Sequence, residues 1–438
     1  MNAVKVLKFG GSSLADADAF RRVAEIVKAE PERRYVVASA PGKRSNTDTK
    51  VTDMLYDCYE LASEEEDITE VFEAIKNRYN EIINDLGLEL DLSEVFEKIR
   101  LAFLNHSGRD YVASRGEYLN AMILAKYLDY HFIDARKVIF FGDDGVFDAE
   151  KTNTVLRNYL AKYERAVIPG FYGSMPNGTI KTFSRGGSDI TGSIVARAAS
   201  ATLYENWTDV SGFLTADPRC IDNPKVIDVI TYKELRELSY MGATVLHEDA
   251  IFPVRYSKIP INIKNTNKPE DKGTFIVYDT DDIPSTVITG IAGKSGFSTI
   301  TIEKDMMNSE LGFGRRVLEA IEENGLSYEH FPSGIDTMSV ILSTKELVKK
   351  RGDVTASICK TVNPENIFIE DNMALIAVVG RGMVKAKGTA ARLFNALAAA
   401  EVNIRMIDQG SSELNIIVGV DENDYITALN AIYNEFVK

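Results

Sequence analysis

A lysine and two glycines stand at the end of the first apolar run of the chain. The run Val4–Phe9 contains Lys8, and Gly10, Gly11 and Ser12 follow it directly. Glycines let a backbone approach phosphate oxygens, and the N–H groups of a following helix favour such anions. A lysine beside this turn can neutralise charge on a phosphoryl group during its transfer. The spacing is not the GxxxxGK[ST] of P-loop NTPases, and a plain tight turn is the structural alternative.

A second glycine-rich turn carries charged side chains in front of a helical segment. It reads SRGGSD over residues 184–189, and the helix is expected over Ile190–Ala201. Arg185 suits bidentate capture of a carboxylate, and Asp189 can hold a lysine or an ammonium group. Capping of the helix by Ser188 or Asp189 is the structural alternative, and both interpretations can hold together.

Two more segments place polar residues where a strand ends or a helix begins. Residues 206–219 (NWTDVSGFLTADPR) leave a strand at Trp207 and form a loop at the expected carboxyl edge of a sheet, where ligands bind in open α/β folds. Residues 113–117 (ASRGE) are expected to open a helix that continues over Tyr118–Leu128. Glu117 then lies in a first turn, where a carboxylate favours the helix dipole. A polar loop and a capping carboxylate are the structural alternatives.

The elements that must position these residues alternate between strand and helix up to about residue 265. A helix is expected to start near Asp16, and residues 64–106, which are acidic and helical in period, are expected to form a helical insertion. This alternation predicts an α/β domain over residues 1–280, with a mostly parallel sheet between layers of helices. The expected strands are Val4–Phe9, Tyr35–Ala40, Val138–Phe141, Ala166–Phe171, Thr202–Trp207 and Ile259–Ile263.

Residues 286–438 show a different pattern after polar, turn-rich stretches at 265–273 and 279–284. Two β-α-β-β-α units are expected, at about 295–365 and 371–438, with interleaving left open; they predict a duplicated ferredoxin-like (α+β) module. The first unit is expected to contain strands Phe297–Glu303, Leu326–His330 and Met338–Leu342 and a helix Phe313–Asn324. The second is expected to contain strands Ala374–Val379, Asn403–Asp408 and Glu413–Val418 and helices Gly388–Ala400 and Asp424–Phe436.

The composition excludes several classes of protein. The net charge is −15, from 65 acidic and 50 basic residues, which argues against a general nucleic-acid binder. No stretch approaches the ~18 consecutive apolar residues of a membrane helix, and the N-terminus lacks the pattern of a secretory signal. Three widely spaced cysteines and four scattered histidines predict neither a disulfide framework nor a metal site. We therefore expect a cytoplasmic protein without a membrane partner.

Six motifs follow one another along the chain: KFGGSS, SAPGK, SRGE, PGFYGS, SRGGSD and WTDVSGFLTADPR. Together they resemble the aspartate kinases, which belong to the amino-acid kinase superfamily and carry a C-terminal pair of ACT modules, so the resemblance covers essentially the whole chain. It implies ATP-dependent phosphorylation of the L-aspartate side chain to 4-phospho-L-aspartate, the first step toward lysine, threonine and methionine. Mg²⁺ would arrive on the nucleotide, without a metal site of its own on the protein.

The resemblance also implies roles for individual residues. Lys8 would contact the transferring phosphate, and Asp189 would organise Lys8 and the substrate amino group. Glu117 would bind the substrate ammonium and Arg185 its α-carboxylate. The residues implied in substrate binding are Ser39, Thr52, Glu117, Arg185 and Ser188. The residues implied in nucleotide binding are Lys8, Gly10, Gly11, Ser12, Thr208, Asp209, Leu214, Asp217, Pro218 and Arg219.

Two positions depart from the family pattern. Thr244, in the segment GATVLHE at 242–248, replaces a lysine expected near the nucleotide phosphates, and Leu214 stands where relatives often have tyrosine. Either Arg219 or Lys264 supplies the missing charge, or ATP binds differently or more weakly. The general assignment does not depend on which of these holds.

The chemistry needs no general base, because an aspartate side chain with a pKa near ~3.9 is already ionised at neutral pH. Alignment and charge neutralisation suffice. Another amino-acid kinase, such as glutamate-5-kinase or acetylglutamate kinase, is one alternative, and an inactive amino-acid sensor, favoured only by Thr244, is another. A fused dehydrogenase is not expected, because Gly380-Arg381-Gly382 leads into GMVKAKG and is interpreted as the loop after a strand of the second module.

The C-terminal modules are expected to bind an inhibitory amino acid, with lysine as the first choice, and to assemble the chain into a homodimer or a dimer of dimers. Related enzymes hold the effector between a helix start and a strand end. Glu329 and Asp336 would pair with the lysine ε-ammonium, and the helix N-terminus would attract its carboxylate. A pair of modules that only dimerises is the alternative. The expected effector residues are Gly312, Phe313, Glu329, Ser333, Gly334 and Asp336.

Overall fold

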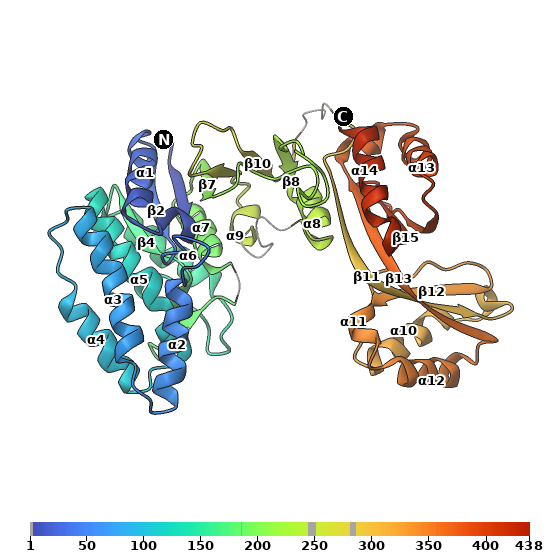
Figure 1. Cartoon of the computed structure of the whole chain (residues 1–438), viewed down its shortest axis with the longest axis horizontal. Helices are drawn as coiled ribbons and strands as arrows, with labels where there is room; N and C mark the ends of the chain where they lie inside the picture. Colours follow the sequence, from blue (N-terminus) through green and yellow to red (C-terminus); the bar gives the residue numbers. More distant parts are fainter. Residues whose placement is uncertain (1–2, 185, 244–250, 281–285) are drawn as a thin grey trace. The chain divides into compact units, whose positions relative to one another are not determined.

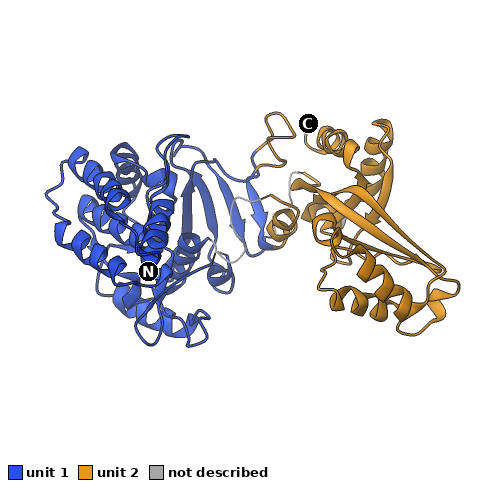
Figure 2. Cartoon of the chain, turned by 60° about the horizontal axis from the view of Figure 1, so that its bottom comes forward, with its two compact units in different colours: residues 1–213, 226–232, 244–280 blue, residues 214–225, 233–243, 281–438 orange. Residues whose placement is uncertain are grey.

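The computed structural model describes residues 3–184, 186–243, 251–280 and 286–438. The chain forms two compact units, coloured separately in Figure 2. Unit 1 comprises residues 1–213, 226–232 and 244–280, and unit 2 comprises residues 214–225, 233–243 and 281–438. Two short segments of the expected catalytic range therefore fold with the C-terminal unit. Within the described ranges, none of the helices combines the length and apolarity of a membrane span.

Unit 1 is built on an eight-stranded sheet with the order β3-β4-β2-β1-β7-β9-β10-β8. All its pairings are parallel except that of β9 with β10. The carboxyl ends of β1, β2, β4 and β7 therefore meet at one edge of the sheet. This confirms the expected mostly parallel α/β sheet. The strands are β1 (Lys5–Phe9), β2 (Arg33–Ala38), β3 (His131–Phe132), β4 (Ala166–Pro169), β7 (Leu203–Thr208), β8 (Val229–Thr231), β9 (Ile261–Asn265) and β10 (Thr274–Val277).

Helices cover both faces of this sheet (Figure 1). One face packs against a core shared with α1 to α5, and α7 packs against β1, β2 and β7 on the other. Helix α1 starts as expected, because the side chain of Asp16 accepts a hydrogen bond from the backbone N–H of Ala19 at 2.8 Å. The helices are α1 (Ala17–Lys28), α2 (Val51–Ser63), α3 (Thr69–Asp85), α4 (Ser93–Leu104), α5 (Arg109–Leu128), α6 (Ala149–Leu160), α7 (Gly187–Ala198) and α9 (Phe252–Arg255).

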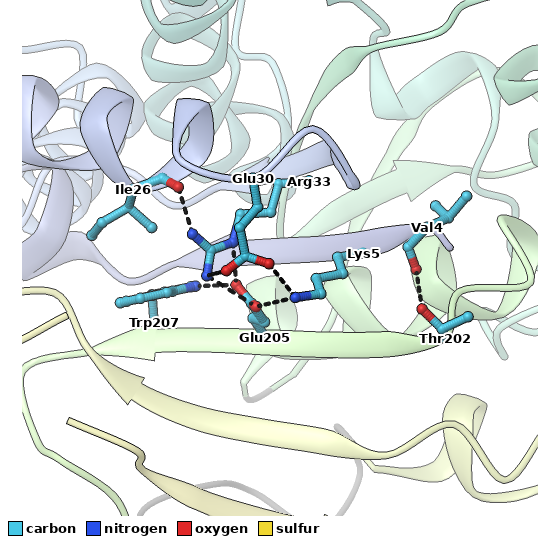
Figure 3. A network of polar contacts seen from close by, with 8 residues as sticks. All are labelled: Val4, Lys5, Ile26, Glu30, Arg33, Thr202, Glu205 and Trp207. Atoms are coloured by element: carbon cyan, nitrogen blue, oxygen red, sulfur yellow. Dashed lines mark hydrogen bonds and ion pairs between the residues drawn. The ribbon is translucent and has the colours of Figure 1, made fainter. Parts of the chain in front are cut away.

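The α1 face of the sheet contains a buried polar network that ties three strands together (Figure 3). The Arg33 guanidinium on β2 donates to Glu205 on β7 at 3.0 and 3.2 Å and to the Ile26 carbonyl at 2.6 Å. The Trp207 indole N–H donates to the same carboxylate at 2.9 Å, and Lys5 on β1 lies 3.8 Å from it. Arg33 and Glu205 are almost fully buried and compensate each other's charge, and the partly exposed Glu30 lies 2.8 Å from the Arg33 guanidinium as a second carboxylate.

The segment Val138–Phe141 is not a strand, contrary to expectation. Its backbone makes single bridges, from Phe140 to Ser174 and from Phe141 to Phe147, and no continuous ladder. The N–H of Phe140 donates instead to the Thr152 hydroxyl at 2.9 Å. Its bridging partner Ser174 ends a small hairpin of β5 (Tyr172–Ser174) and β6 (Ile180–Thr182), which lies outside the main sheet. An apolar run alone could not distinguish this arrangement from a strand.

Unit 2 contains one five-stranded antiparallel sheet with the order β12-β11-β13-β15-β14. Its two longest strands, β11 and β13, pair with each other along both halves, with an irregularity between Lys294 and Phe297. Its elements are β11 (Gly290–Glu303), α10 (Phe313–Glu323), β12 (Thr337–Ser343), α11 (Thr344–Leu347), α12 (Arg351–Val362), β13 (Asn366–Val379), α13 (Thr389–Ala399), β14 (Ile404–Asp408), β15 (Asn415–Asp421) and α14 (Tyr425–Phe436).

Two hydrophobic cores lie along this shared sheet. One joins α10 and α12 to Ile300 and Ile302 of β11, and partly buried Ile367 and Ile369 of β13 pack against it. The other joins α13 and α14 to the opposite halves of the same strands, including Ile291. Each core therefore uses part of both long strands: Ile291 precedes the range expected for the first module, and Ile367 and Ile369 precede the range expected for the second. Gly380 and Gly382 lie in the loop directly after β13, as expected.

The two early segments of unit 2 are held by the second of these cores. Ala216 and Ile221 are buried in it, and the N–H of Ile291 donates to the Thr215 carbonyl at 2.7 Å. In α8 (Tyr232–Tyr240), the carboxylate of Glu234 accepts from the Arg381 guanidinium at 2.9 Å. The loop 214–225 and most of α8 thus belong structurally to the ACT sheet.

The expected strand Leu326–His330 is also absent. Only a bridge between His330 and Ile341 forms, through two backbone hydrogen bonds of 2.8 Å. Gly325 turns the chain with a φ of 60° just before it, and the segment then runs beside β12 for too few residues to make a ladder.

Candidate active site

A buried ion pair marks the carboxyl edge of the unit 1 sheet. Lys8, next to last in β1, is 7% exposed, and its Nζ lies 2.6 Å from Oδ1 of Asp189. Asp189 stands in the first turn of α7, the helix that packs against β1 and β7. The two residues that the motifs singled out separately are therefore in direct contact.

Asn206, the first residue of the segment 206–219, joins this pair, although the resemblance implied no role for it. Its side-chain amide donates to the same oxygen of Asp189 at 2.8 Å, and the residue is 3% exposed. The register of the parallel strands places Asn206 beside Lys8, so both side chains project from one face of the sheet. A polar residue inside an apolar strand was the only signal in the sequence.

Gly11 after β1 and Gly42 in the loop after β2 allow two loops to cross at backbone distance. The N–H of Gly42 donates to the Gly11 carbonyl at 2.8 Å, and a Cβ on Gly42 would lie 2.6 Å from the Gly11 carbonyl carbon. Arg78 of α3, itself buried, donates to the Gly42 carbonyl at 2.7 Å. Glycine is thus required at 42 by close approach, and the helix α3 braces the turn. Ser12 lies exposed in the 3-10 turn that follows.

Glu117 is a buried carboxyl group in the middle of a helix. Helix α5 begins at Arg109, earlier than expected, so the prediction that Glu117 occupies a first helical turn is wrong. Gly108 is the N-cap, with an extended backbone, and the helical conformation begins directly after it. The N–H of Ala40, in the loop after β2, donates to the Glu117 carboxyl group, whereas Oε2 has no hydrogen-bond partner among the described residues. Burial raises the pKa of Glu117 to about 8.

This unpaired oxygen is the strongest local indication of a ligand. A buried polar atom without a partner costs free energy unless something outside the chain satisfies it. Asn120, one turn later in α5, donates to the Ser39 carbonyl at 2.7 Å, which fixes the loop that faces Glu117. Ser39 is half-buried directly after β2, and Thr52 is half-buried in the first turn of α2.

The start of α7 is shaped by glycine rather than by side-chain capping. Gly186 holds a left-handed φ of 56° at the N-cap, where no side chain accepts a hydrogen bond, so the expected capping by Ser188 or Asp189 is wrong. A Cβ on Gly187 would lie 2.5 Å from the Phe171 ring. Gly170 approaches Ser188 equally closely. The PGFYG loop and the SRGGSD turn are therefore packed together. Arg185 lies outside the described residues.

The residues implied in nucleotide binding are divided between the units. Thr208 ends β7 and Asp209 is exposed after it, both in unit 1. Arg219 holds Asp217 through a two-pronged ion pair, with contacts of 2.6 to 3.1 Å. This interaction lowers the pKa of Asp217. The implied residues in unit 2 are Leu214, Asp217, Pro218 and Arg219.

Lys264, a candidate for the charge missing at Thr244, lies on the other face of the sheet from Lys8. It is paired with Trp207 in the register of β7 and β9, and its Nζ lies 5.2 Å from the centre of the Trp207 ring. Trp207 faces the α1 side of the sheet, whereas Lys8 and Asn206 project from the other face. Thr244 itself lies outside the described residues.

The expected effector residues do not all lie together within one chain. Gly312 and Phe313 begin α10, and the Asp336 carboxylate accepts from the Met306 N–H at 2.8 Å in the neighbouring loop. Ser333, Gly334 and Asp336 precede β12, whereas Glu329 lies beside Ile341 near its far end, about 13 Å along the strand. The Glu329 carboxylate also accepts a hydrogen bond from the Tyr240 hydroxyl.

Comparisons with known proteins agree with this architecture. The model of the amino acid kinase family matches residues 3–265, and an ACT domain model matches residues 376–436. Aspartokinase 3 of Bacillus subtilis is 41% identical, over 99% of this chain and 98% of the relative. The structure of Clostridium acetobutylicum aspartate kinase is 52% identical, with a TM-score of 0.91, and covers 99% of this chain and all of that one.

Escherichia coli aspartokinase III, solved in complex with aspartate and ADP, is 26% identical with a TM-score of 0.72, over 99% of each chain. A second structure of it contains lysine and aspartate and has a TM-score of 0.73. The fold, the glycine turn and the Lys8–Asp189 pair, together with these matches, show that the chain belongs to the amino acid kinase family. Within that family it is an aspartate kinase with a C-terminal ACT region.

Proposed function

We propose that the enzyme transfers the γ-phosphoryl group of ATP to the side-chain carboxylate of L-aspartate and forms 4-phospho-L-aspartate. The observation that carries this proposal is the buried Lys8–Asp189 pair beside the glycine turn, at the edge where Glu117 keeps an unpaired oxygen. The complex of the Escherichia coli relative with aspartate and ADP supports the same pair of substrates.

The proposed mechanism relies on alignment and on neutralisation of charge. The attacking carboxylate is already ionised at neutral pH, so no residue has to remove a proton. Charge develops on the transferring phosphoryl oxygens, and Lys8 with the backbone N–H groups of Gly10, Gly11 and Ser12 would stabilise it. ATP would bring Mg²⁺ with it, bound to its phosphates.

Glu117 would bind the ammonium group of aspartate, and Arg185 its α-carboxylate, with Ser39, Thr52 and Ser188 around the side chain. The raised pKa of Glu117 adds a thermodynamic consequence. A positive ammonium beside the carboxyl group favours its ionised form, so aspartate binding should expel the proton that Glu117 holds in the free enzyme. Thr208, Asp209, Leu214, Asp217, Pro218 and Arg219 are proposed to contact the nucleotide on the motif alone.

The activity is tested by ATP-dependent formation of aspartyl hydroxamate, with glutamate and N-acetylglutamate as the competing acceptors. We expect product only with aspartate. Product with another acceptor and none with aspartate would overturn the substrate assignment.

The role of Glu117 is tested by calorimetry of aspartate binding at pH 7 in two buffers of different ionisation enthalpy. We expect release of up to about one proton. The matched variant Glu117→Gln should bind more weakly and release none. Equal proton release from both proteins would assign the proton to another group.

We further propose that the product feeds lysine, threonine and methionine synthesis in the cytoplasm, and that an amino acid inhibits the enzyme through the ACT region of a homodimer or dimer of dimers. Lysine is the first candidate, because the Escherichia coli relative was solved with it. Its α-carboxylate would meet the start of α10, and Asp336 would take its ammonium, with Ser333 and Gly334 in the same loop. Glu329 would need a second chain to join this site.

Titration of lysine, threonine and methionine against activity tests this regulation. An effector must bind one conformation of the enzyme better than the other in order to inhibit. Asp336→Ala should weaken inhibition by lysine, whereas Glu329→Ala serves to show whether that residue takes part. Absence of inhibition by all three amino acids at millimolar concentration would reduce the ACT region to an assembly module.

A further inference from the structure

The ion pair between Lys8 and Asp189 has a third member. The amide of Asn206 donates a hydrogen bond to Oδ1 of Asp189 at 2.8 Å, and the ammonium of Lys8 forms an ion pair with the same oxygen at 2.6 Å. We propose that Asn206 is a positioning residue for phosphoryl transfer, which acts on Lys8 through Asp189.

The strand β7 holds Asp189 at two points. The hydroxyl of Tyr204 donates to the backbone carbonyl of Asp189 at 3.1 Å, and the Asn206 amide reaches the side chain. Tyr204 and Asn206 are two residues apart, so they project from the same face of the strand. Tyr204 is fully buried, and its hydroxyl and ring fill the space where a Cβ on Gly192 of α7 would stand. The first turn of α7 is thereby fixed in both position and side-chain orientation.

The shared oxygen determines what Asn206 contributes. A partly buried carboxylate that faces one ammonium alone can rotate and draw that ammonium toward both of its oxygens. A neutral amide bound to Oδ1 selects one orientation of the carboxylate and shares its charge. Lys8 then remains oriented by Asp189 while its other N–H groups stay available for a phosphoryl oxygen. The carboxylate of Asp189 is 20% exposed, whereas Asn206 is 3% exposed, so Asn206 acts from behind the pair.

This role predicts a specific kinetic signature. Lys8 acts mainly on charge that develops in the transition state, so loss of its alignment should lower kcat more than it raises either KM. Asn206→Leu keeps the approximate volume of the side chain and removes the donor. We expect kcat to fall about tenfold, which corresponds to the loss of one hydrogen bond to a charged group. Both KM values should stay within about threefold of wild type.

The decisive experiment is a double-mutant cycle with Asp189→Asn. If Asn206 acts through the Asp189 carboxylate, Asn206→Leu should lower kcat about tenfold in the wild-type background and less than about twofold in the Asp189→Asn background. An equal loss in both backgrounds, or no loss of kcat in the first, would overturn the proposal. Asn262→Leu is the matched control, because Asn262 is a buried asparagine on the neighbouring strand β9 that projects from the other face. It should change the melting temperature without changing kcat.

A second variant keeps the test valid if Asn206→Leu does not fold. Asn206→Asp has the same shape and places a second carboxylate within hydrogen-bond distance of Asp189. Two carboxylates in contact share a proton, so one of them titrates well above its ordinary pKa. We expect kcat of Asn206→Asp to fall as pH rises, relative to wild type, because the second negative charge then competes for Lys8. A pH profile that parallels the wild type would contradict contact between these groups in the working enzyme.

Discussion

The two faces of strand β7 carry buried polar clusters of opposite character. On the α1 face, Glu205 accepts from Arg33 and Trp207, and no side-chain nitrogen or oxygen of these three residues lacks a partner in the described structure. On the other face, Asn206 and Lys8 meet Asp189 at the edge of the sheet, near the loop where Glu117 keeps an unpaired oxygen. Each cluster combines charged residues with one neutral donor on β7, Trp207 on the α1 face and Asn206 on the other.

The difference separates stability from function. Replacing one member of a fully paired cluster lowers the stability of the fold, because the remaining buried charge loses compensation. An unpaired buried oxygen, such as Oε2 of Glu117, destabilises the free protein, and a ligand that donates a hydrogen bond to it removes this penalty. We therefore expect substitutions on the α1 face to lower stability and substitutions on the other face to lower activity.

Lys8→Ala should give the largest effect, and it should be catalytic. We expect kcat to fall by about 10³-fold, because the variant loses the cation that balances charge on the transferring phosphoryl group. The melting temperature should change little, since Asp189 stays bound to Asn206 and remains partly open to water. Steady-state kinetics and calorimetry check both parts. Near-normal turnover in a folded variant would remove Lys8 from the mechanism.

Glu205→Ala tests the α1 face and should lower stability rather than activity. The variant removes the buried carboxylate from Arg33 and leaves the partly exposed Glu30, 2.8 Å away, as its ion-pair partner. We expect a loss of about 2 kcal/mol in the free energy of unfolding, from the lost hydrogen bonds between charged groups. The kcat of the folded fraction should stay within about threefold of wild type, because the opposite face of the strand is unchanged. Urea denaturation and kinetics at low temperature test this. A large catalytic loss at unchanged stability would show that the two faces are coupled.

Glu117→Gln should change how the stability of the protein depends on pH. The folded pKa of Glu117 is raised to about 8 from an ordinary value of 4.5. Between these values the unfolded chain ionises Glu117 while the ligand-free folded protein keeps it protonated, so stability is lost as pH rises through this window. Glu117→Gln should remove this slope and raise the KM for aspartate about tenfold. Denaturation curves at pH 5, 6.5 and 8 measure the slope, and a parallel slope in the variant would refute the assignment.

Lys264→Ala should give the smallest effect. Lys264 lies over Trp207 on the α1 face, so we expect the KM for ATP to stay within about twofold of wild type. A strong rise in that KM would mean that Lys264 does compensate for Thr244, against the register of β9.

The sequence predicts local features of this molecule well and long-range contacts poorly. Helix α10 starts at Phe313 as expected, because an apolar face of helical period follows Gly312. The start of α5 could not be predicted, because no side chain caps the helix before Arg109. Glu117 therefore lies in the middle of the helix as a buried acid and does not interact with the helix dipole at its N-terminus. The motifs named Lys8 and Asp189, whose contact depends on how α7 packs against β1.

Asn206 could not be recognised from the sequence, because its partner lies 17 residues away on a helix whose position only the packed sheet determines. The same reason explains why the sequence left the boundary between the ACT modules open. The two halves of β11 are separated by an irregularity between Lys294 and Phe297, where Gly296 has a φ of 90°. Their pairing with β13 joins residues that are distant in the sequence, from Glu303 with Asn366 to Gly290 with Val379.

The paired long strands of the ACT sheet bear on how this region can be inherited and engineered. Because β11 and β13 each run through both cores, a cut between the two sequence repeats would remove half a strand from each. We therefore expect that neither repeat folds when it is transferred to another enzyme, and that neither can be deleted alone. A chimera that exchanges effector preference would have to replace residues 286–438 together, and residues 214–225 with them, since that loop is rooted in the same core.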